Sequence, residues 1–188
     1  MEIDNTTLKS LEIIYKVSGE QKGSLLNVID DTCTAAGGRL LKQRIKSPSC
    51  IKNEIDRRLN LAQIFVKNRE VIFILKAFLK EIFDVERSLS RLSFPSPNPK
   101  DLLLIARSIE VSLKIYKKLK NILKTKNDEL DKITKKLKFE KEFILEILKE
   151  INDNCPKNLN DGNFINDGYD KSLDEIRSIK RNATNNIL

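Results

Sequence analysis

The chain has 188 residues, of which 40% are hydrophobic and 33% are charged, and its formal net charge is +8. This length suits one domain with a hydrophobic core, and no uncharged apolar run approaches the roughly 18 residues that a membrane span needs. Because the first residues also show no secretory signal pattern, we expect a cytoplasmic protein without a membrane partner.

Helical stretches follow one another along the chain, separated by clear breaks. A first stretch ends at Gly19 and Gly23, and a second, which includes residues 39–46, ends at Pro48. Beyond this point, apolar stripes at helical spacing predict amphipathic helices. The stripes are Ile51, Ile55, Leu59, Ala62 and Val66; Ile72, Leu75, Leu79 and Ile82; Leu102, Ile105, Ile109, Leu113, Tyr116 and Leu119; Ile133 and Leu137; and Phe143, Ile147 and Ile151.

Two segments rich in proline or asparagine, 93–99 and 152–163, predict loops. The only candidate strand is a very short β segment near residues 163–165, between two Asp-Gly pairs. Helical spacing then returns with Leu173 and Ile176 in the last segment. The sequence therefore predicts an all-α fold.

The residues that catalysis usually needs are missing. The sequence contains neither a GxxxxGK[ST] nor a GxGxxG phosphate-binding loop, and it has no histidine to act as a base near neutral pH. Cys33, Cys50 and Cys155 are too widely spaced to indicate a zinc site, and a disulfide framework is not expected in a cytoplasmic chain. We therefore expect no catalysis, no bound cofactor and no metal in this chain.

Lysines gather between Lys114 and Lys141, although acidic residues interrupt the run. The candidates for phosphate contact are Lys117, Lys118, Lys120 and Lys124. Aromatic residues that could stack on bases are sparse here, so the pattern favours contact with phosphates without sequence reading. A solvated helix surface explains the same composition, and both interpretations stay open.

Six short segments carry a resemblance that covers nearly the whole chain. They are Met1 to Ile13; Ser24 to Thr34; Gly38 to Lys42 with Pro48; Asp84 to Arg87 with Arg91 and Leu92; Asn98 to Leu102; and Asp161 to Arg177. Read in this order, they resemble the central region of the MutS family of DNA mismatch-repair proteins. The chain departs from the family pattern at Ser10, Gly37 and Arg44, where Asn, Met and Trp are common.

The resemblance implies a helical core domain over residues 1–168 and the start of an outgoing lever helix over 169–188. It implies that the chain is truncated before the DNA-gripping clamp. In the parent protein, this segment would link the clamp mechanically to an ATPase domain. The parent protein would bind ATP with Mg²⁺ and mismatched double-stranded DNA. It would form a homodimer, interact with a MutL-type partner and act at the bacterial nucleoid in the cytoplasm. The alternative is a free-standing basic helical protein that binds nucleic acid through Lys114–Lys141.

The resemblance also suggests architectural roles for particular residues. We expect a set of leucines and one valine in the core: Leu11, Leu25, Val28, Leu40 and Leu41. Gly38 and Arg39 belong to the same architectural set, and Gly168 is expected in a turn before the lever. Asp84, Glu86 and Arg87 are candidates for a polar junction between helices; a solvated helix start capped by Asp84 is the alternative.

An unpaired lever helix would expose the apolar stripe that includes Leu173, Ile176, Ile179, Ala183 and Ile187. Isolated helices of this length are marginal in water, so we expect roughly the last 15 residues to be frayed or paired with another copy.

Overall fold

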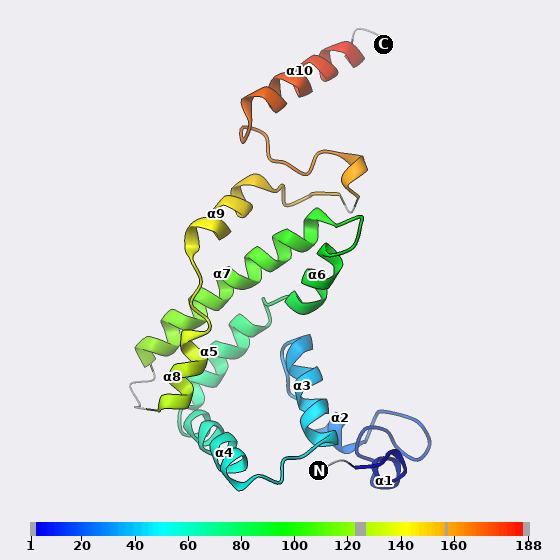
Figure 1. Ribbon diagram of the computed structural model, residues 1–188, viewed down its shortest axis with the longest axis vertical. Helices are drawn as coiled ribbons and strands as arrows, with labels where there is room; N and C mark the ends of the chain where they lie inside the picture. Colours follow the sequence, from blue (N-terminus) through cyan, green and yellow to red (C-terminus); the bar gives the residue numbers. More distant parts are fainter. Residues whose placement is uncertain (1–2, 123–126, 157, 186–188) are drawn as a thin grey trace. The chain divides into compact units, whose positions relative to one another are not determined.

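A computed structural model describes residues 3–122, 127–156 and 158–185 (Figure 1). The prediction of an all-α fold is confirmed, since the described residues form ten α-helices, one short 3₁₀ turn and no strand. The helices are α1 (Asn5–Ser10), α2 (Leu25–Ile29), α3 (Ala35–Lys46), α4 (Lys52–Lys67), α5 (Arg69–Leu79), α6 (Val85–Leu92), α7 (Pro99–Ile122), α8 (Asp128–Lys135), α9 (Lys141–Glu150) and α10 (Lys171–Asn185). The only β feature among these residues is an isolated antiparallel bridge between Ile151 and Ile165.

Side-chain caps start several of these helices where the sequence supplies Asp, Ser, Thr or Asn. Asp4 precedes α1, and its carboxylate accepts hydrogen bonds from the backbone N–H groups of Thr6 and Thr7, each at 2.9 Å. Thr34 accepts from the Gly37 N–H at 3.0 Å, and Asn127 accepts from the Leu130 N–H at 2.9 Å. Each cap satisfies a donor that the first helical turn leaves without an intrahelical partner.

The chain divides into two compact units, and the division crosses α7. The first unit comprises Met1–Asp84 and Val111–Phe139, and the second comprises Val85–Glu110 and Glu140–Leu188. The two halves of α7 belong to different units. The expected assignment of residues 1–168 to a core domain and 169–188 to a lever is not tested by this division. The start of a lever at residue 169 stays a prediction.

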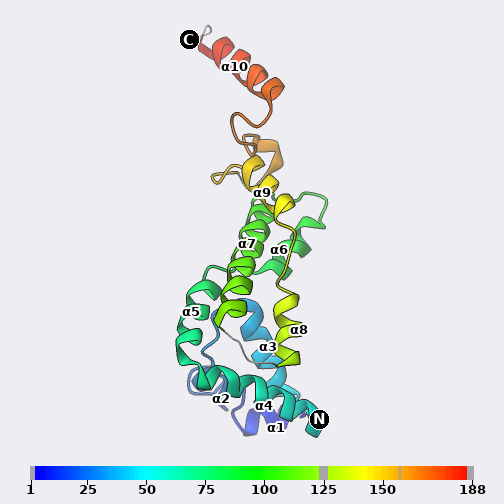
Figure 2. The same cartoon turned by 90° about the vertical axis from the view of Figure 1, so that its left-hand side faces the viewer.

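The first unit contains two apolar clusters. Leu8, Ile13, Ile14 and Leu26 form one cluster, with Ile3, Leu41 and Ile45 packed against it. Val71 of α5 meets Val111, Ile115 and Leu119 of α7 in the other cluster, which Leu137 also contacts. Both views show α5 beside this half of α7 (Figures 1 and 2).

The second unit buries both apolar and polar side chains. Its buried hydrophobic residues are Leu103, Ala106, Ile144, Ile147, Ile151 and Cys155. Burial raises the pKa of the Cys155 thiol, which keeps it in the unreactive protonated form. Ser88, Asp101 and Ser108 are also buried, so this unit must satisfy polar groups internally.

Four of the five residues expected in the core are exposed in this chain, and that expectation is wrong for them. They are Leu11, Leu25, Val28 and Leu40, with exposed fractions of 63%, 47%, 74% and 45%. Only Leu41 packs against a cluster, where it is partly buried. On the five-residue helix α2, Leu26 is the one buried side chain, and Leu25 and Val28 lie on its exposed sides. On α3, Leu41 and Ile45 pack against the cluster, and Leu40 lies outside it.

The apolar stripe on α4 is exposed as well. Ile51, Leu59 and Val66 each expose more than 60% of their surface. The partly buried side of this helix carries Leu61 and Ile64 instead. Regular spacing identified the helix but did not identify which face packs inside the chain.

Candidate functional site

An arginine–aspartate fork joins two distant segments of the first unit. Arg39 on α3 donates from Nη1 to Asp84 Oδ2 at 2.6 Å and from Nη2 to Asp84 Oδ1 at 2.8 Å. The Asp84 side chain is 19% exposed, and the two residues are 45 positions apart. A bidentate pair fixes orientation as well as distance, so it sets how α3 meets the chain just before α6.

A second ion pair secures the loop in front of α3. Lys76 on α5 pairs with Asp31, and this hydrogen bond raises the pKa of the Lys76 ammonium group. The neighbouring Asp30 accepts from the N–H of Thr32 at 3.0 Å and from its hydroxyl at 2.7 Å, which lowers the pKa of Asp30. A Cβ on Gly38 would lie 3.3 Å from the Thr32 hydroxyl oxygen, so a small residue suits this position.

Arg39 therefore joins Asp84 to α3, whereas a polar junction formed by Asp84, Glu86 and Arg87 together stays a prediction. Glu86 and Arg87 lie on α6 with exposed side chains. They belong to the second unit, whereas Asp84 and Arg39 belong to the first.

The start of α10 is anchored to the short β bridge of the second unit. Arg177, whose side chain is only 17% exposed, donates from Nη2 to the carbonyl of Ile165 at 2.8 Å and from Nη1 to Asp167 at 2.7 Å. Ile165 in turn forms the bridge with Ile151. One guanidinium thus ties the second turn of α10 to the segment that precedes it.

The turn before α10 is organised by two carboxylates. Gly168 has a φ of +83°, a conformation that glycine adopts without steric cost. Its N–H donates to Asp174 Oδ2 at 2.7 Å, while Asp170 Oδ1 accepts from the Leu173 N–H at 3.0 Å. Asn166 reinforces this region by donating from Nδ2 to the carbonyls of Lys149 and Ile151 at 2.8 and 3.1 Å. The loop, the turn and the helix therefore form one hydrogen-bonded unit.

Elsewhere in the second unit, a buried carboxylate pairs with an arginine whose side chain is 49% exposed. Asp101, which is 2% exposed, accepts hydrogen bonds from Arg91, one of them from Nε at 2.9 Å. Arg91 also donates to the Ser88 hydroxyl at 3.0 Å. The Arg91 guanidinium and Ser88 lower the pKa of Asp101 although burial opposes this, so the carboxylate stays ionised at neutral pH.

The lysine candidates lie on exposed helix surfaces. Lys117, Lys118 and Lys120 are exposed on α7, whereas Lys124 lies outside the described residues. Exposed Asp128 and Asp131 on α8 follow in the same run. The lysines thus face solvent among acidic residues, which agrees with both interpretations of the run.

Sequence reasoning missed three side chains that the structure places in well-defined polar contacts: Arg177, Asp174 and Asp101. All three stand within the segments that carried the resemblance, but they were not assigned roles. The signal that could have found Arg177 and Asp174 is their spacing of three, which places both on one face of the first turns of the helix. Asp101 comes two residues after Pro99 at a helix start, where an acid is favoured by the helix dipole, but its burial depends on the tertiary fold.

Within the part of the chain that the structure describes, no helix is long and apolar enough to cross a membrane. The same residues contain no cluster of three or more His, Cys, Asp or Glu side chains that could hold a metal ion.

Comparison with known proteins places the chain among mismatch-repair proteins. Residues 6–188 match the family model for MutS domain III. The chain is 34% identical over 189 residues to DNA mismatch repair protein MutS of Orientia tsutsugamushi (strain Boryong). The aligned region covers 100% of this chain and 21% of that protein. It is 35% identical over 187 residues to the MutS of Caldanaerobacter subterraneus subsp. tengcongensis, covering 98% and 21%. The MutS of Geobacillus sp. (strain WCH70) is 33% identical over 185 residues, covering 97% and 21%. The chain therefore spans about a fifth of the length of these relatives.

Proposed function

This chain belongs to the MutS domain III family, and from that membership we propose that it is the mechanical core and lever segment of a DNA mismatch-recognition ATPase. Its role is to transmit movement between a nucleotide-binding domain and a DNA clamp, both outside these residues. The chain itself performs no catalysis. Packed helices suit such a role because they have a few discrete arrangements rather than continuous flexibility.

The observation that carries this proposal is the anchored start of α10. A lever helix transmits movement only if its first turns keep a fixed orientation relative to the segment before them. Arg177 supplies that constraint through its bonds to Ile165 and Asp167, and Asp174 holds the Gly168 turn. Residues 169–188 then act as the beginning of the outgoing lever, and residues 1–168 as the helical core.

The remaining activities belong to the whole protein. It binds mismatched double-stranded DNA and ATP with Mg²⁺, acts as a homodimer, recruits a MutL-type partner and works in the bacterial cytoplasm at the nucleoid. What supports this is the family membership and the name of the relatives, each a DNA mismatch repair protein MutS.

The test is an Arg177→Ala substitution in the whole mismatch-repair protein that carries this sequence. We expect ATP hydrolysis without DNA to be retained, whereas stimulation of hydrolysis by mismatched DNA is lost. The reason is that a helix start without a fixed orientation no longer couples the DNA clamp to the nucleotide-binding domain. The measurement is steady-state ATPase activity with and without a G·T-mismatched duplex.

Arg181→Ala is the matched control. Arg181 lies one turn further along α10, is 68% exposed and reaches Asp167 only at 3.6 Å. It should leave the stimulation near the wild-type value. Equal stimulation in wild type and Arg177→Ala would refute a lever role for this anchor.

A further inference from the structure

A basic hollow lies between α1, the segment after it and α3 in the first unit. It has a volume of about 410 Å³, within the size range of small-molecule sites. Four of its lining residues are lysines, Lys9, Lys16, Lys42 and Lys46, and none is an aspartate or glutamate. Its apolar floor consists of buried Leu8 and Ile14, which belong to the neighbouring core cluster. The floor gives the hollow a fixed shape, because it is part of the packed interior.

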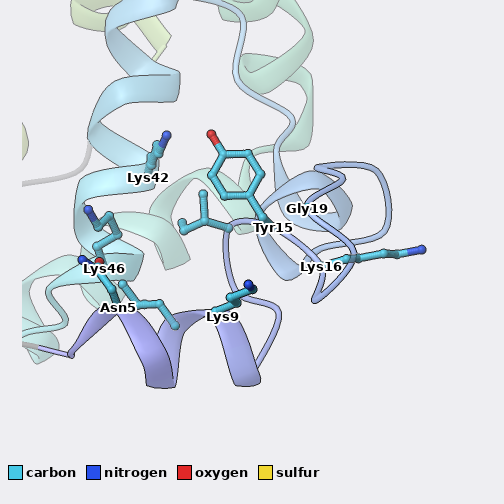
Figure 3. A pocket seen from close by; sticks show the side chains of 9 residues that line it. Asn5, Lys9, Tyr15, Lys16, Gly19, Lys42 and Lys46 are labelled. Atoms are coloured by element: carbon cyan, nitrogen blue, oxygen red, sulfur yellow. The ribbon is translucent and has the colours of Figure 1, made fainter.

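The side chains around the hollow come from separate segments of the chain (Figure 3). Lys42 and Lys46 stand one helical turn apart on α3, and Lys9 and Tyr15 come from α1 and the segment that follows. The Lys42 ammonium lies 5.7 Å from the centre of the Tyr15 ring, within range of a cation–π contact. Lys16 extends away from this group in Figure 3, which leaves Lys9, Lys42 and Lys46 as the lysines around the hollow.

Neighbouring carboxylates do not neutralise these lysines. In the described parts of the chain, no salt bridge joins Lys9, Lys42 or Lys46 to an aspartate or glutamate. Like charges gathered around one hollow raise the local positive potential, which an anionic ligand would relieve.

A second hollow, of about 320 Å³, extends the basic surface along α3. It shares Lys42 and Lys46 with the first and adds Gln43 and Arg39, whose guanidinium is held by Asp84. Lys42 and Lys46 therefore stand between two hollows and can reach an anion in either one.

We propose that this hollow, defined by Lys9, Tyr15, Lys42 and Lys46, binds the phosphate groups of a polyphosphate anion. The lysine ammonium groups donate charge-assisted hydrogen bonds to phosphate oxygens, and the Tyr15 hydroxyl donates one more. The phosphates come either from a free polyphosphate or from a nucleic-acid backbone. This site goes beyond the mechanical role and does not depend on it.

The experiment is calorimetric titration of the chain with sodium pyrophosphate at constant ionic strength, comparing wild type with Lys42→Gln/Lys46→Gln. We expect the double substitution to weaken binding by about tenfold or more, because it removes two charge-assisted contacts. Tyr15→Phe, which keeps the ring and removes the hydroxyl, should weaken it less. Circular dichroism confirms that the variants are folded; if the double variant is not, Lys9→Gln takes its place.

The matched control is Lys52→Gln/Lys67→Gln. These two lysines are exposed, on α4 in the same unit, so the variant has the same change in net charge. It should change pyrophosphate affinity by no more than about twofold. Equal losses in both double variants, or pyrophosphate binding no tighter than sulfate binding, would overturn the proposal.

Competition separates the two sources of phosphate. A short single-stranded oligonucleotide that displaces pyrophosphate from wild type, and binds more weakly to Lys42→Gln/Lys46→Gln, assigns the site to a nucleic-acid backbone. Failure of the oligonucleotide to displace pyrophosphate assigns it to a free polyphosphate. Neither result bears on the Arg177 test, so the two proposals can fail separately.

Discussion

Asp101 shows how a single buried carboxylate stabilises the second unit. It is almost fully buried, and Arg91 satisfies both of its oxygens. Replacing Asp101 with Asn removes the charge that Arg91 pairs with and sets an amide N–H₂ donor against the guanidinium at a buried position. We expect Asp101→Asn to lower the free energy of unfolding by about 1.5–3 kcal/mol, measured by urea denaturation.

Asp153→Asn is the matched control for this substitution. Asp153 also pairs with an arginine, Arg107, but its side chain is 70% exposed. Exposed pairs contribute about 1 kcal/mol or less, so this variant should remain close to wild type. Equal destabilisation by the two substitutions would contradict a special role for the buried carboxylate.

The pKa of Asp101 also predicts a dependence of stability on pH. Because Arg91 holds this pKa below its ordinary value in the folded state, the ionised carboxylate stabilises the fold at any pH above the unfolded pKa. That stabilisation is lost as the pH falls through the lowered folded pKa. Thermal melts between about pH 5 and pH 2 should show a smaller loss of melting temperature in Asp101→Asn than in wild type. Parallel losses in the two proteins would contradict this assignment.

At the scale of the element, α10 combines an anchored start with an exposed remainder. Arg177 and Asp174 hold its first turns, whereas Ile176 and Ile179 expose 64% and 67% of their surface. Side-chain contacts therefore stabilise α10 mainly at its N-terminal end. The remainder is marginally stable, because a short helix without packing is marginal in water.

Hydrogen exchange should reveal this gradient along α10. We expect amide protection to fall from residue 173 toward residue 183 and to stay below that of residues 102–113 in a dilute sample. The exchange is measured by NMR at several protein concentrations. Protection that rises with concentration would show pairing with another copy, and uniform high protection in the dilute sample would contradict the prediction.

At the scale of the whole molecule, the net charge of +8 and the family membership predict different behaviour toward DNA. A basic chain attracts any duplex through counterion release, with affinity that falls steeply with salt. Under the proposed core and lever role, mismatches are read by another part of the whole protein. We therefore expect weak binding with no difference between a G·T-mismatched and a fully paired duplex, measured by fluorescence anisotropy over a salt series.

The Lys117→Gln/Lys118→Gln variant tests the alternative function on the same assay. Submicromolar, strongly salt-dependent binding that this variant abolishes would favour a free-standing nucleic-acid-binding protein. Weak binding that the variant barely changes would favour the mechanical role. Tighter binding of wild type to the mismatched duplex would contradict both.

The sequence by itself determined the helical class, the loop positions, the short β feature near residue 165 and the family. These depend on local properties: helical spacing, the conformations of proline and glycine, and the order of short motifs. The turn at Gly168 belongs to the same class, because a positive φ before a helix is a local requirement that glycine meets.

Only the tertiary structure decided which faces are buried and which charges meet. The outward position of Leu25 and Val28, the pairing of Arg39 with Asp84 across 45 residues, and the burial of Asp101 all depend on how distant helices pack. Apolar spacing predicts that a helix has an apolar face but not which element packs against it. A charged residue has many possible partners in the sequence, and the tertiary fold determines which of them lies within reach. The basic hollow has the same origin, since Lys9 and Lys42 are 33 positions apart in the sequence and are brought together only by the packing of α1 and α3.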